Sequence, residues 1–286
     1  MASSSALSPA IWALLAPIAR FKQRSHHTSL TSHLRILQSC AENPTTSPSI
    51  IFLGDSMLER FITTGKSPNF TAPWPSPTLL PELPADTDSC RLPHTLNAGV
   101  GGDKIQNMAY RLLGSEPESL PSLAAAIANL KNVKLWVIHA GTNNLKPKSG
   151  LSDQDVAALE ALLRVVLEIN GAPGVSTRVI MTAILYRKDV SDEKVDDANQ
   201  KIKGVVDKLN QESGGMLADK RVTWLGPDAV KGLRKEEHLM DHVHLNLEGY
   251  RIWVREALFP EVVRVLKEVK EAGEDEGPRG VGDVRD

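Results

Sequence analysis

The sequence is poor in cysteine, has no surplus of basic residues and contains no long apolar run. Only two cysteines, Cys40 and Cys90, occur in its 286 residues. That is too few for a disulfide framework or a four-cysteine zinc site, so the chain tolerates reducing conditions. Its 33 lysines and arginines against 35 aspartates and glutamates give a net charge of -2. Binding to nucleic acid normally needs a concentrated basic face, so we expect no nucleic-acid partner.

No apolar run is long enough to cross a lipid bilayer, which takes ~18 residues. The longest candidate spans residues 10–19, contains Pro17 and is followed at once by Arg20 and Lys22. The 286 residues, 41% of them hydrophobic, are enough to bury a full core. We therefore expect one soluble globular domain of α/β size and no transmembrane segment.

The first 41 residues contain no aspartate or glutamate but include Arg20, Lys22, Arg24, Arg35 and many serines. This composition is typical of an organellar transit peptide, which would direct the protein to the mitochondrion. An equally weighted alternative is an arm that packs on the domain before the first strand. In that case the protein is cytoplasmic.

Short apolar segments alternate with segments of helical composition along the rest of the chain. The predicted strands are residues 49–53, 94–97, 135–140, 178–185 and 221–225. The predicted helices are residues 104–113, 122–130, 153–169, 195–209 and 247–270, the last interrupted near Pro260. Ser152 is a plausible N-cap of the third helix. Such alternation predicts a parallel sheet covered by helices on both faces.

The same survey divides the chain into three parts. Residues 1–48 are the arm or transit segment, and residues 49–270 form the α/β domain. Within that domain, residues 67–88 contain six prolines, which exclude a long helix or a central strand and predict a loop-rich insert. Residues 271–286 are acidic and glycine-rich without apolar periodicity, so we expect a disordered tail.

Four short polar or glycine-rich motifs follow predicted strands. They are Gly54-Asp55-Ser56, residues 97–103, residues 141–144 and residues 241–244. In an open parallel sheet, ligands bind outside the carboxyl ends of the strands. We therefore expect these four motifs to converge on one edge of the sheet.

Together the motifs supply the groups of a serine esterase site. A serine hydroxyl becomes nucleophilic when an imidazole removes its proton and a carboxylate orients that imidazole. Ser56, His244 and Asp241 fit these roles, since Asp241 lies three residues before His244. The backbone N–H of Gly102 and the side-chain amide of Asn143 are suited to stabilising an oxyanion.

Each motif also has a structural interpretation. Ser56 and Glu59 match a capping box, in which the serine hydroxyl caps a helix. Glycines before Gly102 fit a tight turn, and Asn143 with Asn144 could form a turn after the third strand. The turn at Ser56 lacks the second glycine of the G-x-S-x-G nucleophile elbow, which argues against the α/β-hydrolase fold.

A zinc site is the main alternative for the histidine motif. His238 and His242 are four residues apart, with Asp241 and His244 beside them. The H-E-x-x-H pattern is not met, because Leu239 stands where the general base should be. We therefore favour a site without a metal.

On these motifs the chain resembles an SGNH hydrolase of the GDSL esterase/lipase superfamily over about residues 49–259. Within that superfamily, residues 97–112 with Gly102-Asp103 and Tyr110-Arg111-Leu112 are similar to the catalytic subunits of intracellular platelet-activating-factor acetylhydrolase. Met57 replaces the leucine of the name-giving motif, a mild departure. The resemblance implies a flavodoxin-like three-layer α/β/α fold with a five-stranded parallel sheet, and neither metal nor organic cofactor.

The resemblance also implies the roles of the residues. Ser56 is then the nucleophile and an oxyanion donor through its N–H, Gly102 and Asn143 are the other donors, and Asp241 with His244 is the acid–base pair. The substrate is a small-molecule, lipid or carbohydrate ester, with short acyl groups such as acetyl expected. A scaffold protein that keeps the fold is an alternative, and a homodimer is a possible assembly.

Overall fold

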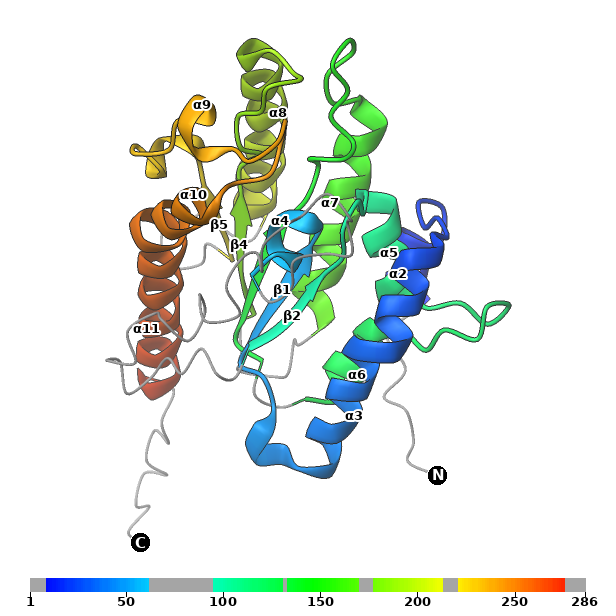
Figure 1. Cartoon of the computed structure of the whole chain (residues 1–286). Coiled ribbons are helices and arrows are strands. Elements are labelled where there is room, and N and C mark those ends of the chain that lie inside the picture. The colour runs from blue at the N-terminus through cyan, green and yellow to red at the C-terminus, as the bar shows by residue number, and fades with distance from the viewer. Residues whose placement is uncertain (1–8, 62–94, 131–132, 170–176, 213–220, 276–286) are drawn as a thin grey trace, which may run out of the picture.

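The computed structural model describes residues 9–61, 95–130, 133–169, 177–212 and 221–275. These residues contain a parallel sheet of five strands in the order β2-β1-β3-β4-β5 (Figure 1). Helices flank both faces, which confirms the predicted three-layer α/β/α fold. The strands are β1 (Ile50–Gly54), β2 (Thr95–Gly99), β3 (Leu135–His139), β4 (Arg178–Thr182) and β5 (Val222–Leu225).

Side chains of the central strands alternate between two hydrophobic cores, as the pleat of a strand requires. Ile51 and Leu53 of β1 enter the larger core, whereas Ile50 and Phe52 enter the smaller one. All five residues of β1 and of β3 are buried. This burial on both faces explains why these strands read as continuous apolar runs in the sequence.

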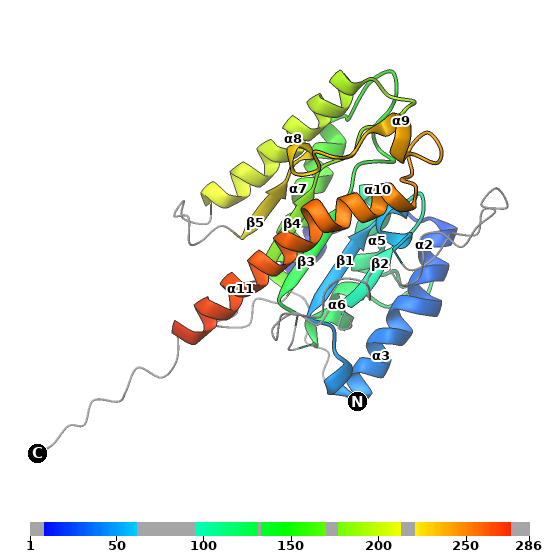
Figure 2. The ribbon, with the colours of Figure 1, turned by 60° about the vertical axis from the view of Figure 1, so that its left-hand side comes forward.

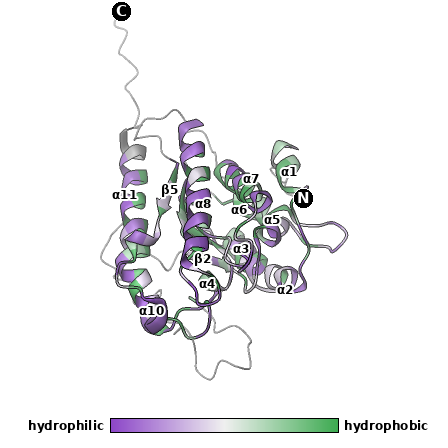
Figure 3. Ribbon diagram, turned by 90° about the horizontal axis from the view of Figure 1, so that it is seen from above, coloured by the Kyte–Doolittle hydropathy of each residue, from purple (hydrophilic) through white to green (hydrophobic). Residues whose placement is uncertain are grey.

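Among the described helices that cover the larger core are four that lie between β2 and β5 in the sequence, and the third of these has the predicted bounds. Its predicted N-cap is also confirmed, because Ser152 Oγ accepts a hydrogen bond from the Asp155 N–H at 3.2 Å. The four helices are α5 (Ile105–Leu113), α6 (Leu123–Ala128), α7 (Asp153–Ile169) and α8 (Asp192–Glu212). Seen from above, α8 alternates hydrophilic and hydrophobic residues, as expected for a helix with one face on a core (Figure 3).

The smaller core lies under the C-terminal helices, which cross in front of the sheet in Figure 2. Here α10 (Leu247–Ile252) runs through a π-helical turn, Trp253–Leu258, into α11 (Phe259–Asp275). This π-helical turn corresponds to the predicted interruption near Pro260. Proline has no N–H to donate to the carbonyl four residues before it, as a regular α-helix requires. The helix runs five residues past 270 into the segment for which we expect a disordered tail, and residues 276–286 lie outside the described part.

The N-terminal segment packs on the domain from residue 9 onward. It forms α1 (Pro9–Leu15), α2 (Gln23–Thr28), a π-helical turn (Ser29–His33) and α3 (Leu34–Glu42). Leu15 and Leu37 are buried in the larger core. Of the two N-terminal interpretations, the described residues have the conformation of the packed arm.

Strand β4 is shorter than predicted, ending at Thr182 instead of residue 185. The side chain of Asn199 on α8 accepts a hydrogen bond from the Ile184 N–H and donates one to the Ile184 carbonyl, both at 2.9 Å. These two bonds satisfy the backbone N–H and carbonyl of Ile184 in place of bonds to a neighbouring strand, so the chain leaves the sheet here. The proline-rich insert, residues 67–88, lies outside the described residues. Among the residues that the structure covers, no helix combines the length and apolarity of a membrane span.

Candidate active site

Three side chains form a continuous hydrogen-bonded chain at the carboxyl edge of the sheet. Ser56 Oγ lies 2.9 Å from His244 Nε2, although the two residues are 188 positions apart in the sequence. His244 Nδ1 lies 2.7 Å from Asp241 Oδ2. Because the carboxylate accepts from Nδ1, the ring carries its proton there and Nε2 is free to accept the serine proton. The structure therefore joins Ser56, His244 and Asp241 in the predicted order.

Ser56 begins the short helix α4 (Ser56–Glu59) directly after β1, but it does not cap that helix. The cap is Asp55, whose Oδ1 accepts the Met57 N–H at 2.9 Å. Glu59 does not reach back either, since its carboxylate accepts from Arg24 Nη2 at 2.8 Å. The capping-box interpretation of Ser56 is therefore wrong, and the serine hydroxyl is available to His244.

Gly54 allows the sharp passage from β1 into α4. A Cβ on this residue would lie 2.7 Å from the His139 carbonyl oxygen of β3 and 2.7 Å from Leu58 Cδ1. Such contacts are far inside van der Waals distance, so another residue would push β1 away from β3 or shift α4. The glycine thus holds Ser56 close to the neighbouring strands.

The loop that carries the histidine is organised by Asp241. Its Oδ1 accepts from the Val243 N–H at 2.8 Å and from the His244 N–H at 2.7 Å, while Oδ2 binds the ring. Leu239 and Leu245 form an antiparallel bridge that closes the loop. One carboxylate therefore fixes both the backbone and the imidazole of this segment.

Electrostatics keep the pair in the form that a general base needs. Burial lowers the pKa of His244 below its ordinary 6.5, and the bond to Asp241 opposes this shift. Burial alone would raise the pKa of Asp241, but hydrogen bonds from His244 and Val243 hold it well below its ordinary value. At neutral pH the site therefore holds a neutral imidazole beside an ionised carboxylate.

The two expected oxyanion segments lie on either side of the serine strand. β1 is paired with β2 on one side and with β3 on the other. Gly102, in the loop after β2, has a positive φ of 75°, which glycine adopts without strain. Asn143 follows β3 and donates from Nδ2 to the Asp103 carbonyl at 2.9 Å. The Asn143 side chain thus lies against the loop that contains Gly102.

Sequence patterns did not reveal what holds that loop. The Asp103 carboxylate is fully buried, and its Oδ2 accepts from Arg111 Nε at 2.9 Å. Its Oδ1 accepts from Ser25 Oγ at 2.5 Å and from Lys22 Nζ at 3.3 Å. Arg111 also donates to the Gly54 carbonyl at 3.3 Å, which ties the loop to the serine strand. The sequence signal for these residues was the Gly102-Asp103 and Tyr110-Arg111-Leu112 pattern. It did not indicate that Asp103 and Arg111 contact each other.

A buried polar network below the site contains His139, the last residue of β3. His139 Nδ1 lies 2.7 Å from Thr182 Oγ1, and Nε2 lies 2.9 Å from Thr142 Oγ1. Burial lowers the pKa of His139 to about 4, so the ring is neutral at neutral pH. The residue is buried in the sheet, with both ring nitrogens in contact with threonine hydroxyls.

The alternative zinc ligands have other partners. His238 Nδ1 accepts the Arg234 N–H at 2.9 Å, and His242 Nε2 lies 4.0 Å from Asp189. Within the described ranges, no group of three or more His, Cys, Asp or Glu side chains is placed to hold a metal ion. Cys40 is free and buried, and Cys90 lies outside the described residues.

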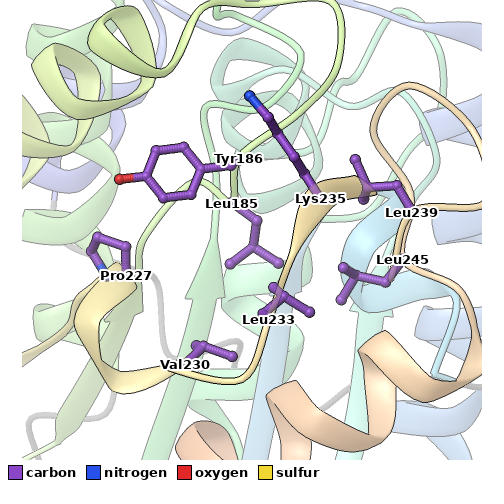
Figure 4. A pocket seen from close by; sticks show the side chains of 8 residues that line it. All are labelled: Leu185, Tyr186, Pro227, Val230, Leu233, Lys235, Leu239 and Leu245. Atoms are coloured by element: carbon purple, nitrogen blue, oxygen red, sulfur yellow. The ribbon is translucent and has the colours of Figure 1, made fainter. Parts of the chain in front are cut away.

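An apolar pocket lies beside the histidine loop (Figure 4). Leu239 and Leu245, which flank that loop, form one side of it. The hydroxyl of Tyr186 and the amine of Lys235 point away from the apolar centre, and they bond Asp196 and Asp192 at 2.6 Å each. The full lining is Leu185, Tyr186, Pro227, Val230, Leu233, Lys235, Leu239 and Leu245.

The strand order and the position of Ser56, His244 and Asp241 define a doubly wound α/β protein with its site at the carboxyl edge of the sheet. Residues 52–252 match the model of the GDSL-like lipase/acylhydrolase family. The chain therefore belongs to this family of ester-bond hydrolases. No curated protein matches the chain significantly.

Solved structures of other proteins are similar to this chain at low sequence identity. Est24, a carbohydrate acetylesterase from Sinorhizobium meliloti, is 17% identical with a TM-score of 0.50, and the match covers 77% of this chain and 100% of that one. A carbohydrate esterase family 3 protein from Talaromyces cellulolyticus is 17% identical with a TM-score of 0.48, covering 77% and 99%. The M. smegmatis aryl esterase is 14% identical with a TM-score of 0.47, covering 77% and 100%. At 17% identity the likeness to Est24 shows the fold alone.

Proposed function

We propose that this protein is a metal-independent carboxylic ester hydrolase that forms an acyl-enzyme on Ser56. The observation that supports it most directly is the 2.9 Å contact between Ser56 Oγ and His244 Nε2, continued at 2.7 Å to Asp241. A hydroxyl, an imidazole and a carboxylate in this order are the parts that nucleophilic catalysis by serine requires.

The reaction divides into two steps. His244 Nε2 removes the Ser56 proton as Oγ attacks the ester carbonyl carbon, and Asp241 stabilises the imidazolium that forms. The imidazolium then protonates the leaving alcohol, which departs as the C–O bond breaks and leaves the acyl group on Ser56. Water, activated by the same imidazole, attacks the acyl carbon, releases the carboxylic acid and restores the serine.

The oxyanion of each tetrahedral intermediate is stabilised by three N–H donors: the backbone of Ser56, the backbone of Gly102 and the side chain of Asn143. Two structural features support this assignment. Ser56 and Gly102 follow paired strands, and Asn143 is bonded to the residue after Gly102. Donors held in advance cost no reorganisation when charge develops, and removing one lowers turnover by about 10² to 10³.

Short acyl esters, acetyl esters above all, are the proposed substrates. The resemblance to acetylhydrolase subunits supports this class, as does the carbohydrate acetylesterase among proteins of the same fold. The alcohol part is a small metabolite, a lipid or a sugar. A panel of p-nitrophenyl esters from acetate to palmitate tests the chain length. The proposal expects the highest kcat/KM with acetate, and a preference for long chains contradicts it.

Two controls make the panel specific. Ser56→Ala must abolish turnover, because no other group of the proposed site forms the acyl-enzyme. Treatment with EDTA must leave turnover unchanged, because the proposed mechanism uses no metal. Turnover that survives Ser56→Ala or is lost with EDTA rules out the mechanism. A wild-type protein without any esterase activity favours a scaffold or binding protein.

The proposal places the protein in the cytoplasm with residues 1–41 retained. What supports this is the packing of α1, α2 and α3 on the domain, where Leu15 and Leu37 are buried. Fusing residues 1–41 to a fluorescent reporter tests it. A diffuse cytosolic signal is expected, whereas import into mitochondria contradicts it.

A further inference from the structure

The helix α2 and the residue before it lie directly against the loop that contains Gly102. Lys22 Nζ donates to the Gly101 carbonyl at 2.8 Å and contacts Asp103 Oδ1 at 3.3 Å. Ser25 Oγ, one turn further along, donates to the same Asp103 oxygen at 2.5 Å. Two side chains of the N-terminal segment therefore hold both neighbours of Gly102.

Asp103 connects these contacts to both expected oxyanion segments. Its backbone nitrogen follows Gly102, and its carbonyl accepts the Asn143 amide at 2.9 Å. Its carboxylate is fully buried, with Arg111 on Oδ2 and with Ser25 and Lys22 on Oδ1. A buried carboxylate must keep such partners, because leaving it unpaired is costly. A change at Lys22 or Ser25 therefore shifts the loop of Gly102 and the side chain of Asn143 together.

Lys22 also approaches Gly102 itself. A Cβ on Gly102 would lie 3.0 Å from Lys22 Nζ, and the Lys22 side chain is 29% exposed. Burial lowers the pKa of Lys22, while the charge of Asp103 and its hydrogen bond oppose this shift. The ammonium group therefore lies close to the glycine whose N–H would face the oxyanion.

The same segment is fixed to the helices on both sides of the loop. Arg24 forms an ion pair at 2.8 Å with Glu59 of α4, the helix that begins with Ser56. The Arg20 N–H donates to the Gln106 carbonyl of α5 at 3.0 Å, and Asn107 Nδ2 donates to the Arg20 carbonyl at 2.9 Å. Lys22 and Ser25 thus contact the loop from a segment that is held in place independently.

We propose that Lys22 and Ser25 are positioning residues of the oxyanion hole, which they hold through Gly101 and Asp103. The inference rests on the proposed function, because it takes Gly102 and Asn143 as the donors. A donor that is misplaced stabilises the transition state less but leaves ground-state binding of the ester unchanged. Lys22 and Ser25 therefore act on kcat and not on KM.

The test compares Lys22→Met and Ser25→Ala with Arg35→Met, a matched control. Arg35 belongs to the same N-terminal segment, is exposed, and loses the same charge as Lys22. Hydrolysis of p-nitrophenyl acetate is measured per active site, with sites counted by a fluorophosphonate. In Lys22→Met, kcat per site falls by about tenfold. This is smaller than the loss of about 10² to 10³ expected when an oxyanion donor is removed altogether. KM stays unchanged, phosphonylation slows by a similar factor, and Arg35→Met equals the wild type.

Two further variants separate positioning from folding. Lys22→Arg keeps a cationic donor and recovers most of the lost kcat. The double variant Lys22→Met with Ser25→Ala loses less than the product of the single losses, because both side chains act on the same Asp103 oxygen. If Lys22→Met does not fold, Ser25→Ala decides, since it removes only one hydroxyl.

The opposing outcomes are equally definite. If Lys22→Met and Ser25→Ala lose active sites but keep the wild-type kcat per site, their role is only structural and the inference is wrong. An increase in KM alone, or a loss that Arg35→Met shares, also overturns it. If the wild type shows neither turnover nor a phosphonate adduct, the proposed function fails and the inference falls with it.

Discussion

The carboxylate of Asp55 caps helix α4 by accepting the Met57 N–H at 2.9 Å, which leaves the hydroxyl of the intervening Ser56 to His244. Capping and nucleophilic attack compete for a hydroxyl at the start of a helix. Here the competition is resolved because the residue before the serine takes the capping role. This separation makes the two roles accessible to independent mutations.

Ser56→Ala is expected to abolish ester hydrolysis without lowering the melting temperature. The reason is that the hydroxyl contributes no cap, whose loss would cost about 0.5–2 kcal/mol. Thermal unfolding followed by circular dichroism, alongside turnover of p-nitrophenyl acetate, measures both effects. A drop in stability of the size expected for a lost cap contradicts the assignment of the cap to Asp55.

Asp55→Asn is expected to change how stability depends on pH. Burial raises the pKa of Asp55 to about 7. Hydrogen bonds from the Met57 N–H and the Thr142 side chain oppose this shift, as does the charge of Arg187, while the charge of Asp103 adds to it. The folded state thus binds a proton that the unfolded chain, with a pKa of 3.8, has lost. The stability from Asp55 is full below pH 3.8 and is lost as the pH rises through about 7.

The asparagine variant lacks this loss, so its stability relative to wild type must rise between pH 4 and 7, by at most about 1.4 kcal/mol per pH unit. Urea unfolding of both proteins at several pH values provides the measurement. A constant difference between the two proteins across this range contradicts the raised pKa. The amide keeps the oxygen that caps α4, so loss of the cap does not confuse the comparison.

His33→Leu is expected to flatten the decline of stability at acid pH. His33 is 2% exposed, and burial lowers its pKa from 6.5 to about 3. Because the folded pKa is depressed, the stability that His33 contributes is present above pH 6.5 and is lost as the pH falls toward 3. Across this window the variant must lose less stability than wild type, by about 1.4 kcal/mol per pH unit at most. Parallel pH profiles for variant and wild type in urea unfolding contradict this.

The pH profile of kcat/KM reports the pKa of the proposed general base, His244. His244 must be neutral to accept the serine proton, and burial lowers its pKa. Activity is therefore expected to rise with pH along a limb whose midpoint lies below the ordinary 6.5 of histidine. A midpoint above 6.5 contradicts the assignment. Asp241→Asn moves the midpoint of this limb to a still lower pH, because Asp241 is what raises the pKa of His244. The same change lowers kcat by about 10⁴.

Arg111→Met is expected to destabilise the fold by about 3–5 kcal/mol, because it leaves the buried Asp103 carboxylate without its main partner. Arg111 and Asp103 are both fully buried, and Arg111 also donates to the Ala98 carbonyl at 2.9 Å. Equilibrium unfolding in urea measures the loss. The double variant Arg111→Met with Asp103→Leu must lose less stability than Arg111→Met alone. An equal or larger loss contradicts the cost assigned to the unpaired carboxylate.

The sequence predicted the sheet and the three-residue chain of the site for identifiable physical reasons. Apolar runs buried on both faces mark β1 and β3, and ligand residues of a parallel sheet follow strand ends. Asp241 and His244 are neighbours in sequence, so their contact is local. These three features can be recognised without knowing which distant segments meet.

The contacts that the sequence did not predict are long-range or compete with a local pattern. Ser25 and Asp103 are 78 positions apart, and no periodicity links them. Asn199 ends β4 by bonding a residue 15 positions away, which composition does not indicate. At Ser56 the capping pattern was present, but Asp55 beside it was the better placed cap. Such outcomes depend on tertiary geometry and not on the residue types alone.

Intact-mass measurement after reaction with a fluorophosphonate tests the central claim most directly. The account predicts one adduct per chain, located on Ser56 by peptide mapping and absent from Ser56→Ala and His244→Ala. A fully folded wild type that forms no adduct, or an adduct on any residue other than Ser56, contradicts it.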